Sequence, residues 1–449
     1  MRFTGIREKK TRQAVAVCVL AAVLTVGCGS DAAVPALENG NTEIDAVSGN
    51  DLAETESVSE NDARPAVLVK GIYMTGYTAG SEQLDELIRL VEETELNTLV
   101  IDVKNDDGQI TYAMDSPLVK ETGAATAQIP DIGILVEKCR EKDIYLIARV
   151  VAFKDPLLAE KRPELAVRKK NGEIFRDKKG LAWVNPYKKE VWDYLVEIAA
   201  QAADAGFDEI QFDYIRFSTD LKAEELDFGP EAEGKSRTRV ITEFTQYAYD
   251  ALSPLGVKVS ADVYGTVIDN RIDQDIVGQR YAAMARHLDY ICPMVYPSHY
   301  GPGNFGLEVP DAQPYETIFG AMQQSKEVLG RIPEEERAGV RVWLQAFTAG
   351  WVSGHISYGA EQLRQQMKGA YDAGYEEWIL WNAAAGYKRE WFFTDEEAAA
   401  EEKRWQLERA RKKRAAVVAE QREKEQAEKA EKTEEGKSGE TVSENEAEP

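Results

Sequence analysis

The sequence contains Glu209-Ile-Gln-Phe-Asp-Tyr-Ile-Arg-Phe217 and, about fifty residues later, Val257-Lys-Val-Ser-Ala-Asp-Val-Tyr-Gly265. Both are short apolar runs typical of buried β-strands, and each carries one carboxylate near its carboxyl end. A helical pattern over residues 236–252 separates them, which predicts two parallel neighbouring strands joined by a crossover helix. Such an arrangement places Asp213 and Asp262 side by side.

The same alternation of an apolar run, a loop and an amphipathic helix extends through the middle of the chain. The predicted strands cover about residues 69–76, 98–106, 145–153, 209–217, 257–265, 289–296, 340–347 and 377–383. The predicted helices cover about residues 81–94, 131–142, 186–205, 236–252, 273–288, 315–329 and 360–373, with a last one starting near Thr394. Strict alternation at this length predicts an α/β fold, the (β/α)8 TIM barrel. An open doubly wound sheet is the alternative, but the first strand lacks its Gly-rich turn.

Polar residues gather where the predicted strands end, which is the mouth of a TIM barrel. They are Asp102, Lys104, Arg149, Asp213, Asp262, Tyr264, Tyr296, Gln345 and Asn382. We interpret the set as a substrate site with Asp213 and Asp262 as its catalytic pair. The structural alternative is that some of these residues satisfy one another inside the barrel, for example Asp102 with Lys104 or Arg149.

Paired carboxylates predict glycoside hydrolysis, in which one carboxyl protonates the leaving oxygen and the other acts as nucleophile or base. Burial or the charge of the neighbouring carboxylate would raise the pKa of the acid, and Arg149 near Asp213 would keep that group ionised. Strand ends that are neighbours suit the roughly 5 Å carboxyl separation of a retaining enzyme. The short Asp side chains also allow the roughly 6.5–9.5 Å of an inverting one.

Several motifs follow one another along the chain: Lys70-Gly-Ile-Tyr-Met-Thr-Gly76, Leu99-Val-Ile-Asp-Val-Lys-Asn-Asp-Asp-Gly108, Ile147-Ala-Arg-Val-Val-Ala-Phe-Lys-Asp155, Trp183-Val-Asn-Pro-Tyr187, Phe212-Asp-Tyr-Ile-Arg-Phe217 and Ser260-Ala-Asp-Val-Tyr-Gly265. Together they resemble a family of bacterial glycoside hydrolases that was long filed as a domain of unknown function, DUF4015. The resemblance covers about residues 70–392 and departs at Ser218, where the family usually has Pro. It implies a TIM barrel related to α-amylase-like enzymes, with Asp213 as nucleophile or transition-state stabiliser and Asp262 as general acid/base.

Aromatic residues in the loops after the strands are typical of sugar sites, where flat apolar faces pack against pyranose rings. These loops contain Tyr77, Trp183, Tyr187, Tyr296, His299, Tyr300, Trp351 and Trp381. Substrate contacts are expected from Asp102, Lys104, Arg149, Trp183, Arg216, Tyr264, Tyr296, His299, Gln345, Trp381 and Asn382. Trp183 and Trp381 could equally be core residues. A long basic insert, residues 154–180, is predicted to form a lid or wall beside the site.

Composition divides the 449 residues into one folded domain and polar ends. We predict a barrel domain over residues 67–393, an acidic disordered linker over residues 29–66, and a charged tail over residues 394–449 that is helical at first and then disordered. The tail could also form a coiled coil or bind an anionic wall polymer. A formal net charge of −25 argues against nucleic acid as a partner.

The amino terminus predicts export. Basic residues precede the apolar run 14–27, which is the length of a signal-peptide core and short for a membrane span. The run ends in a sequence that resembles a bacterial lipobox, with Thr25 as its departure, so Cys28 is the expected lipidation site. We therefore predict a signal peptide over residues 1–28 and a lipid-anchored protein on the extracellular face of the membrane. Ordinary secretion and an uncleaved anchor are the alternatives.

Other chemistries find weaker support in the sequence. Cys139 and Cys292 predict buried free thiols rather than a disulfide. Three scattered histidines, His287, His299 and His355, do not form a metal-binding pattern. No cofactor is expected, and the partner is an oligo- or polysaccharide. The functional alternative is a barrel that binds cell-surface carbohydrate without cleaving it.

Overall fold

The computed structural model describes residues 67–220 and 225–440. Eight parallel strands close into a barrel in the order β10-β11-β1-β2-β3-β5-β7-β8, and β8 pairs back to β10. The barrel strands are β1 (Lys70–Met74), β2 (Thr98–Lys104), β3 (Tyr145–Val151), β5 (Glu209–Asp213), β7 (Lys258–Tyr264), β8 (Tyr290–Met294), β10 (Val342–Gln345) and β11 (Trp378–Trp381). A two-residue strand, β9 (Gly339–Val340), also pairs with β8. The predicted (β/α)8 barrel is confirmed.

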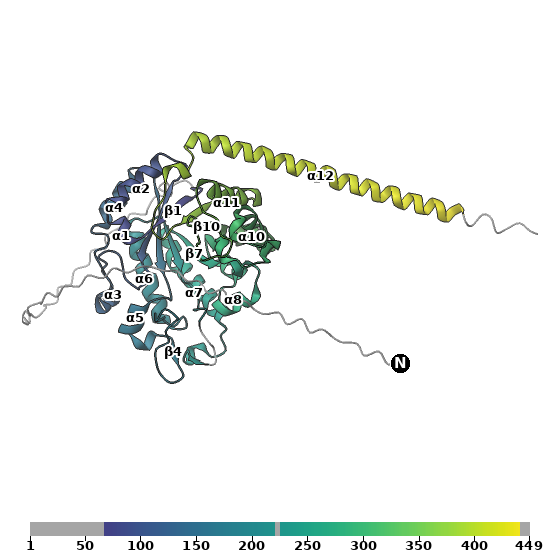
Figure 1. The fold of residues 1–449 in the computed structure, drawn as a ribbon. Helices are drawn as coiled ribbons and strands as arrows, with labels where there is room; N and C mark the ends of the chain where they lie inside the picture. The colour runs from purple at the N-terminus through teal and green to yellow at the C-terminus, as the bar shows by residue number, and fades with distance from the viewer. Residues whose placement is uncertain (1–66, 221–224, 441–449) are drawn as a thin grey trace, which may run out of the picture. The chain divides into compact units, whose positions relative to one another are not determined.

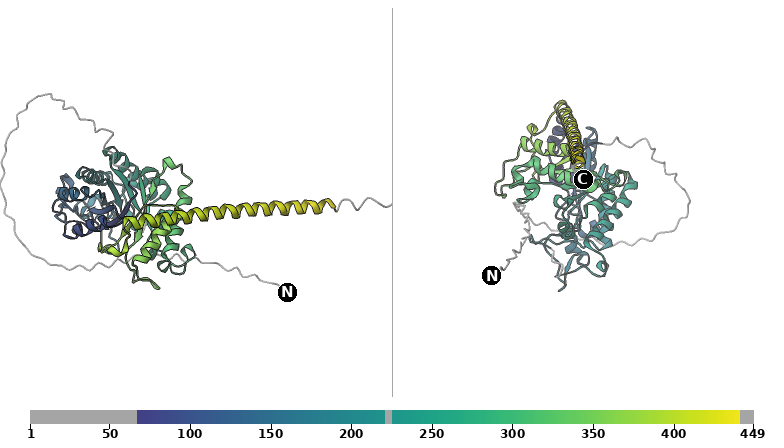
Figure 2. Two further views of the ribbon diagram at one scale, coloured as in Figure 1. Left: turned by 90° about the horizontal axis from the view of Figure 1, so that it is seen from above. Right: turned by 90° about the vertical axis from the view of Figure 1, so that its right-hand side faces the viewer.

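Helices surround the strands on the outside (Figures 1 and 2). They are α1 (Gly76–Ala79), α2 (Gln83–Glu92), α3 (Pro117–Thr122), α4 (Ile132–Arg140), α5 (Pro156–Lys161), α6 (Lys189–Ala205), α7 (Arg237–Leu252), α8 (Arg271–Val277), α9 (Tyr281–Met284), α10 (Pro314–Leu329) and α11 (Ala360–Ala373). A last helix, α12 (Asp395–Glu440), follows the barrel in the chain. The expected crossover helix between the two opening motifs is α7. Ser236 caps it by accepting a hydrogen bond from the backbone N–H of Arg239 at 3.1 Å. The single helix expected over 273–288 is instead divided into α8, α9 and a 3-10 turn at Ala285–His287.

Alternation along the strands separates the outer core from the barrel interior. In β5, Phe212 points outward and its ring packs against Phe244 of α7, with ring centres 5.5 Å apart. A separate apolar cluster fills the interior and includes Val100, Ile147 and Trp343. Inward positions of β5 and β7 are polar, which is unusual for a barrel that serves only as a scaffold.

A buried ion-pair network closes the amino-terminal end of the barrel. Arg341 Nη1 donates to both carboxylate oxygens of Glu209, at 2.7 and 2.8 Å, and its Nη2 donates to Glu377 at 3.0 Å. Arg341 and Glu209 are completely buried, and Ser260 donates to Glu209 at 2.5 Å. Cys292 belongs to the apolar cluster of the interior and Cys139 lies on the buried face of α4; both are buried free thiols, as predicted.

The predicted insert after β3 is built of short elements. Its strand β4 (Arg168–Lys169) pairs antiparallel with β6 (Leu226–Asp227), which belongs to the loop after β5. Lys178 and Asp220 add an ion pair of 2.9 Å between the same two loops. The insert is therefore tied to the loop that leaves Asp213, consistent with a wall beside the carboxyl end of β5.

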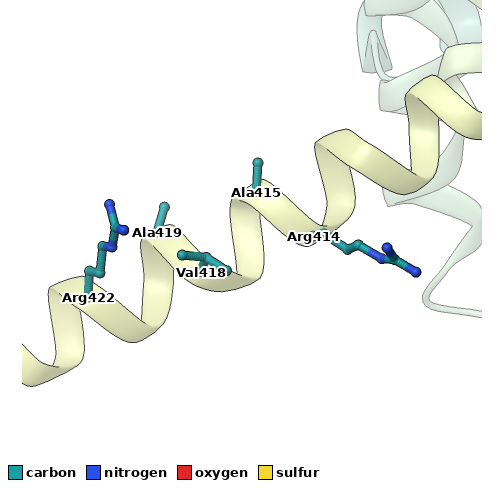
Figure 3. Close-up of a pocket in the computed structure, with 5 residues that line it drawn as sticks. All are labelled: Arg414, Ala415, Val418, Ala419 and Arg422. Carbon is teal, nitrogen blue, oxygen red and sulfur yellow. The ribbon is translucent and has the colours of Figure 1, made fainter.

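The tail begins as predicted with a helix, α12. Its first part packs on α11: the Trp405 and Tyr371 rings lie 4.7 Å apart and Arg409 donates to the Tyr371 carbonyl at 2.9 Å. Farther along, Arg414, Ala415, Val418, Ala419 and Arg422 line a hollow on the helix surface to which no barrel strand contributes (Figure 3). Among the described residues, no helix has the length and apolarity that a membrane crossing requires.

The expected signal peptide, Cys28 and the linker lie outside the described residues, as does the end of the tail from residue 441. Their predictions, and the predicted coiled coil, stay predictions.

Candidate active site

Asp213 is the last residue of β5, and its carboxylate is held at both oxygens. Arg149 donates to Oδ2 from Nε at 3.0 Å and from Nη2 at 2.5 Å. The backbone N–H of Tyr214 donates to Oδ1 at 2.5 Å. Tyr214 has a φ of +48°, in the left-handed region that non-glycine residues seldom occupy. Local backbone strain of this kind is often found at functional sites.

Arg149 of β3 is the centre of a cluster of carboxylates. Besides Asp213, it donates to Asp102 at 2.6 Å and to Asp106 at 3.0 Å. Lys154 holds the other oxygen of Asp106 at 2.7 Å. Burial raises the pKa of Asp106, but the charges of Arg149 and Lys154 outweigh it and bring that pKa far below its ordinary value. Asp102 therefore pairs with Arg149 inside the barrel, which was the structural alternative. It has little hydrogen-bonding capacity left for a sugar.

Asp262, on the neighbouring strand β7, lies in a different environment. Residues Phe212 and Ala261 are paired in the β5–β7 register, so Asp213 and Asp262 occupy the next matching positions. Asp262 is 1% exposed, and its Oδ1 accepts a hydrogen bond of 2.6 Å from the Trp343 indole N–H. Burial, and next the charge of Asp213, raise the pKa of Asp262 well above its ordinary value, while the bond from Trp343 acts in the opposite direction. The two carboxyls therefore lie in opposite environments, Asp213 in contact with a cation and Asp262 in contact with an uncharged donor.

Lys104 does not join these residues. The β2–β3 register shifts between Asp102 and Lys104, so that Lys104 pairs with Val150 of the outward face. Its ammonium is completely buried, donates to the carbonyl of Val151 at 2.8 Å and lies 2.9 Å from Asp155 in an ion pair without aligned hydrogen-bond geometry. As placed, Lys104 has no face open to a substrate.

Arg216 is surrounded by aromatic rings. Its guanidinium carbon lies 4.4 Å from the centre of the Tyr264 ring, 4.7 Å from Tyr214 and 5.2 Å from Trp183. The indole N–H of Trp183 donates to Asp177 of the insert at 3.1 Å. Trp183 is only 4% exposed, so it supports the site more than it offers a face to a ligand.

Tyr296 and His299 lie beyond the end of β8, and Gln345 is the last residue of β10. The Tyr296 and His299 rings meet edge to face at 5.2 Å. Burial, followed by the charges of Asp262 and Asp213, raises the pKa of Tyr296. Burial lowers the pKa of His299 to about 4, so the ring is neutral near pH 7. Gln345 is completely buried and holds the backbone of Ser298 and the side chain of Asp311.

Trp381 is the last residue of β11, and Asn382 follows it. Trp381 is partly exposed and stacks on Tyr73, with ring centres 4.1 Å apart. Arg149 lies 5.4 Å from the Trp381 ring centre, so the indole lies beside the carboxylate cluster. Asn382 shapes its own loop by donating to the carbonyls of Ala346 and Gly386.

Sequence reasoning did not single out three residues of this arrangement. Trp343 donates to Asp262, Asp106 shares Arg149 and Lys154, and Tyr73 donates to Asp102 at 2.7 Å. Asp106 and Tyr73 each lie within one of the motifs quoted above, so the rule that alternate residues of a strand face the interior could have added them to the predicted site. Trp343 carries no such signal, because tryptophan on a strand is also typical of a barrel core.

No group of three or more His, Cys, Asp and Glu side chains within residues 67–220 and 225–440 is placed to hold a metal ion. The carboxylates that do converge here surround Arg149 instead.

A family model described as "Putative glycosyl hydrolase domain" (DUF4015) matches residues 71–387. The chain belongs to the DUF4015 family. The match spans the barrel and includes both Asp213 and Asp262, and it confirms the resemblance seen in the motifs. The DUF4015 protein is therefore a glycosidase by family. No curated protein matches the chain.

Solved structures similar to this DUF4015 protein include a hypothetical protein from Ruminiclostridium thermocellum, at 42% identity over 43% of this chain and 97% of that chain, with a TM-score of 0.40. The glycoside hydrolase domain of PgaB (BpsB) from Bordetella bronchiseptica matches at 16% identity over 71% of this chain and 95% of that one, with a TM-score of 0.49. An α-galactosidase from Thermus thermophilus matches at 15% identity over 76% of this chain and 63% of that one, with a TM-score of 0.45.

Proposed function

We propose that the protein hydrolyses a glycosidic bond of an extracellular or cell-envelope glycan, with Asp213 as nucleophile and Asp262 as general acid/base. One observation carries this proposal: two buried carboxyls on adjacent strand ends lie in opposite environments. Asp213 is bound to the Arg149 cation, whereas Asp262 has only an uncharged indole donor and a raised pKa. Two carboxyls whose environments separate their pKa values are the usual acid and nucleophile of a glycosidase.

In the first step Asp262 gives its proton to the leaving glycosidic oxygen while Asp213 attacks the anomeric carbon, so that the glycosidic bond breaks as a glycosyl–Asp213 ester forms. In the second step Asp262 takes a proton from water, whose oxygen displaces Asp213 from the anomeric carbon. Adjacent parallel strands are about 4.8 Å apart, which favours the roughly 5 Å carboxyl separation of this retaining route over the wider inverting one.

Arg149 has a positioning role in this scheme. Arg149 donates two hydrogen bonds to Oδ2 of Asp213, and the Tyr214 N–H donates one to Oδ1. These bonds fix the plane of the carboxylate. The partly exposed Trp381 beside Arg149 offers a flat apolar face for a pyranose ring.

The test is release of reducing sugar from a panel of bacterial envelope glycans and α-linked glycans by the full chain. We expect cleavage of at least one glycan, and product analysis by ¹H NMR should show the anomeric configuration of the substrate retained. Specific glycan binding without cleavage anywhere on the panel would instead favour the carbohydrate-binding barrel. An inverted product would keep hydrolysis but assign Asp213 the role of base.

We further propose that Cys28 anchors the protein to the outer face of the membrane through a lipid. The basic start, the apolar run 14–27 and the small Gly27 before Cys28 support this location. Cys28→Ser should move the protein from the detergent phase to the aqueous phase in detergent partitioning and abolish its labelling by fatty acid. Equal partitioning of both forms would favour ordinary secretion.

A further inference from the structure

Arg216 is a cation buried among aromatic rings beside the proposed catalytic pair. The side chain is 7% exposed, and the rings of Tyr264, Tyr214 and Trp183 surround its guanidinium at 4.4–5.2 Å. Rings stacked in this way cover the faces of a guanidinium and leave its edge of N–H groups for hydrogen bonding.

Most of that edge has no protein partner. Arg216 Nη1 donates to the carbonyl of Phe217 at 3.0 Å, and within the described part of the chain Arg216 forms no ion pair. Neither Nε nor Nη2 is among the buried atoms that lack a hydrogen-bond partner, so both atoms reach solvent. Nε and Nη2 form the side of the guanidinium that binds a carboxylate through two parallel hydrogen bonds.

The other cations near Asp213 are occupied. Arg149 binds Asp213, Asp102 and Asp106, and Lys154 binds Asp106 at 2.7 Å. Asp220 lies within electrostatic range of Arg216, but Lys178 holds it at 2.9 Å. Arg216 is thus the cation of this group whose charge no carboxylate offsets by contact.

Two tyrosines connect Arg216 to the catalytic pair. Burial raises the pKa of both Tyr214 and Tyr264, and the charges of Arg216 and Asp213 act on both hydroxyls. Tyr214 follows Asp213 directly, and Tyr264 comes two residues after Asp262. A sugar ring beside Asp213 would therefore have Arg216 within reach of one of its substituents.

We propose that Arg216 binds a carboxylate of the substrate, so that the glycan cleaved here carries an acidic sugar, a uronic or otherwise carboxylated residue, next to the scissile bond. The inference rests on the proposed function in taking this site to hold a sugar. An anion at this position would restore the partner that the buried guanidinium lacks, and the two-pronged contact would discriminate a carboxylate from the hydroxymethyl group of a neutral sugar.

The experiment compares matched sugars on the full chain by calorimetry: glucuronate against glucose, and N-acetylmuramate against N-acetylglucosamine. The acidic member of at least one pair should bind about tenfold tighter or more, the range expected of a charge-assisted hydrogen bond. Arg216→Gln should remove the preference and Arg216→Lys should restore only part of it. The matched control is Arg237→Gln, because Arg237 also stacks on two aromatic rings and donates to one backbone carbonyl, and it should keep the full preference.

Equal binding of acidic and neutral sugars by the unmodified chain would overturn the inference, whether or not the variants fold. An acidic preference that survives in folded Arg216→Gln would overturn it too. The outcome is separable from that of the proposed function: hydrolysis of neutral glycans without any acidic preference refutes only this inference, and an acidic preference without hydrolysis refutes only the catalytic proposal.

Discussion

Arg149 and Asp213 are joined by two hydrogen bonds that converge on one carboxylate oxygen, at 3.0 and 2.5 Å. Both side chains are almost completely buried, so solvent weakens this contact little. The same guanidinium also binds Asp102 and Asp106. The single charge of Arg149 thus stabilises three carboxylates at the mouth of the barrel. Asp262 is the neighbouring carboxyl that has no cation in contact with it.

Replacing Arg149 tests this dependence. In Arg149→Met the three carboxylates lose their common partner, and we expect the free energy of unfolding near pH 7 to fall by about 3–5 kcal/mol, as for other buried ion pairs broken on one side. Urea denaturation measures the change. Because protonation relieves the repulsion, the deficit should shrink as the pH is lowered. A loss under about 1 kcal/mol would mean that the carboxylates are not held by Arg149.

Activity should fall at high pH because Asp262 loses the proton that it donates. Burial and the Asp213 charge raise the pKa of Asp262, so the acid is protonated above the ordinary Asp range, and kcat/KM should fall as the pH rises through that raised pKa. Trp343→Phe removes a donor that favours the charged form, so the pKa of Asp262 should rise further. We expect this fall in kcat/KM to move to higher pH. A downward shift would contradict this arrangement.

The free energy of unfolding should also depend on pH through Asp262. A pKa raised in the folded state means that protonated Asp262 favours folding. This contribution is complete below the unfolded pKa of about 3.9 and is lost as the pH rises through the folded value. Asp262→Asn cannot ionise, so its stability relative to the unmodified protein should increase between pH 5 and pH 9. Urea unfolding across this range measures the difference, and a constant difference would show that Asp262 has no raised pKa.

Lys104 should prove structural. Its buried ion pair with Asp155 predicts that Lys104→Met loses about 3–5 kcal/mol of stability while the KM of the folded fraction stays within about twofold, because the ammonium faces no substrate. Steady-state kinetics at a temperature where the variant is folded provides the measurement. A large rise in KM at unchanged kcat would show that Lys104 contacts the substrate.

The barrel could be predicted from the sequence because each strand is an apolar run in the residue pattern. The neighbouring positions of Asp213 and Asp262 could be predicted too, because both residues occupy matching strand ends. Strand parity failed at Lys104, where a register shift that leaves no trace in the residue pattern turns the side chain to the outer face. It also missed Trp343, whose indole N–H reaches across the interior to Asp262. Contacts across a barrel depend on which strands face each other, and local spacing does not encode them.

We propose that Asp213 and Asp262 together carry out the hydrolysis. The most direct measurement is kcat for the full chain beside Asp213→Asn and Asp262→Asn on a glycan that it cleaves, with Asp275→Asn, an exposed Asp paired with Arg280, as the control. We expect kcat to fall about a thousandfold or more in each of the first two variants, with glycan affinity retained and the control unchanged. Activity within a few-fold of the unmodified protein in either Asp213→Asn or Asp262→Asn would contradict the proposal.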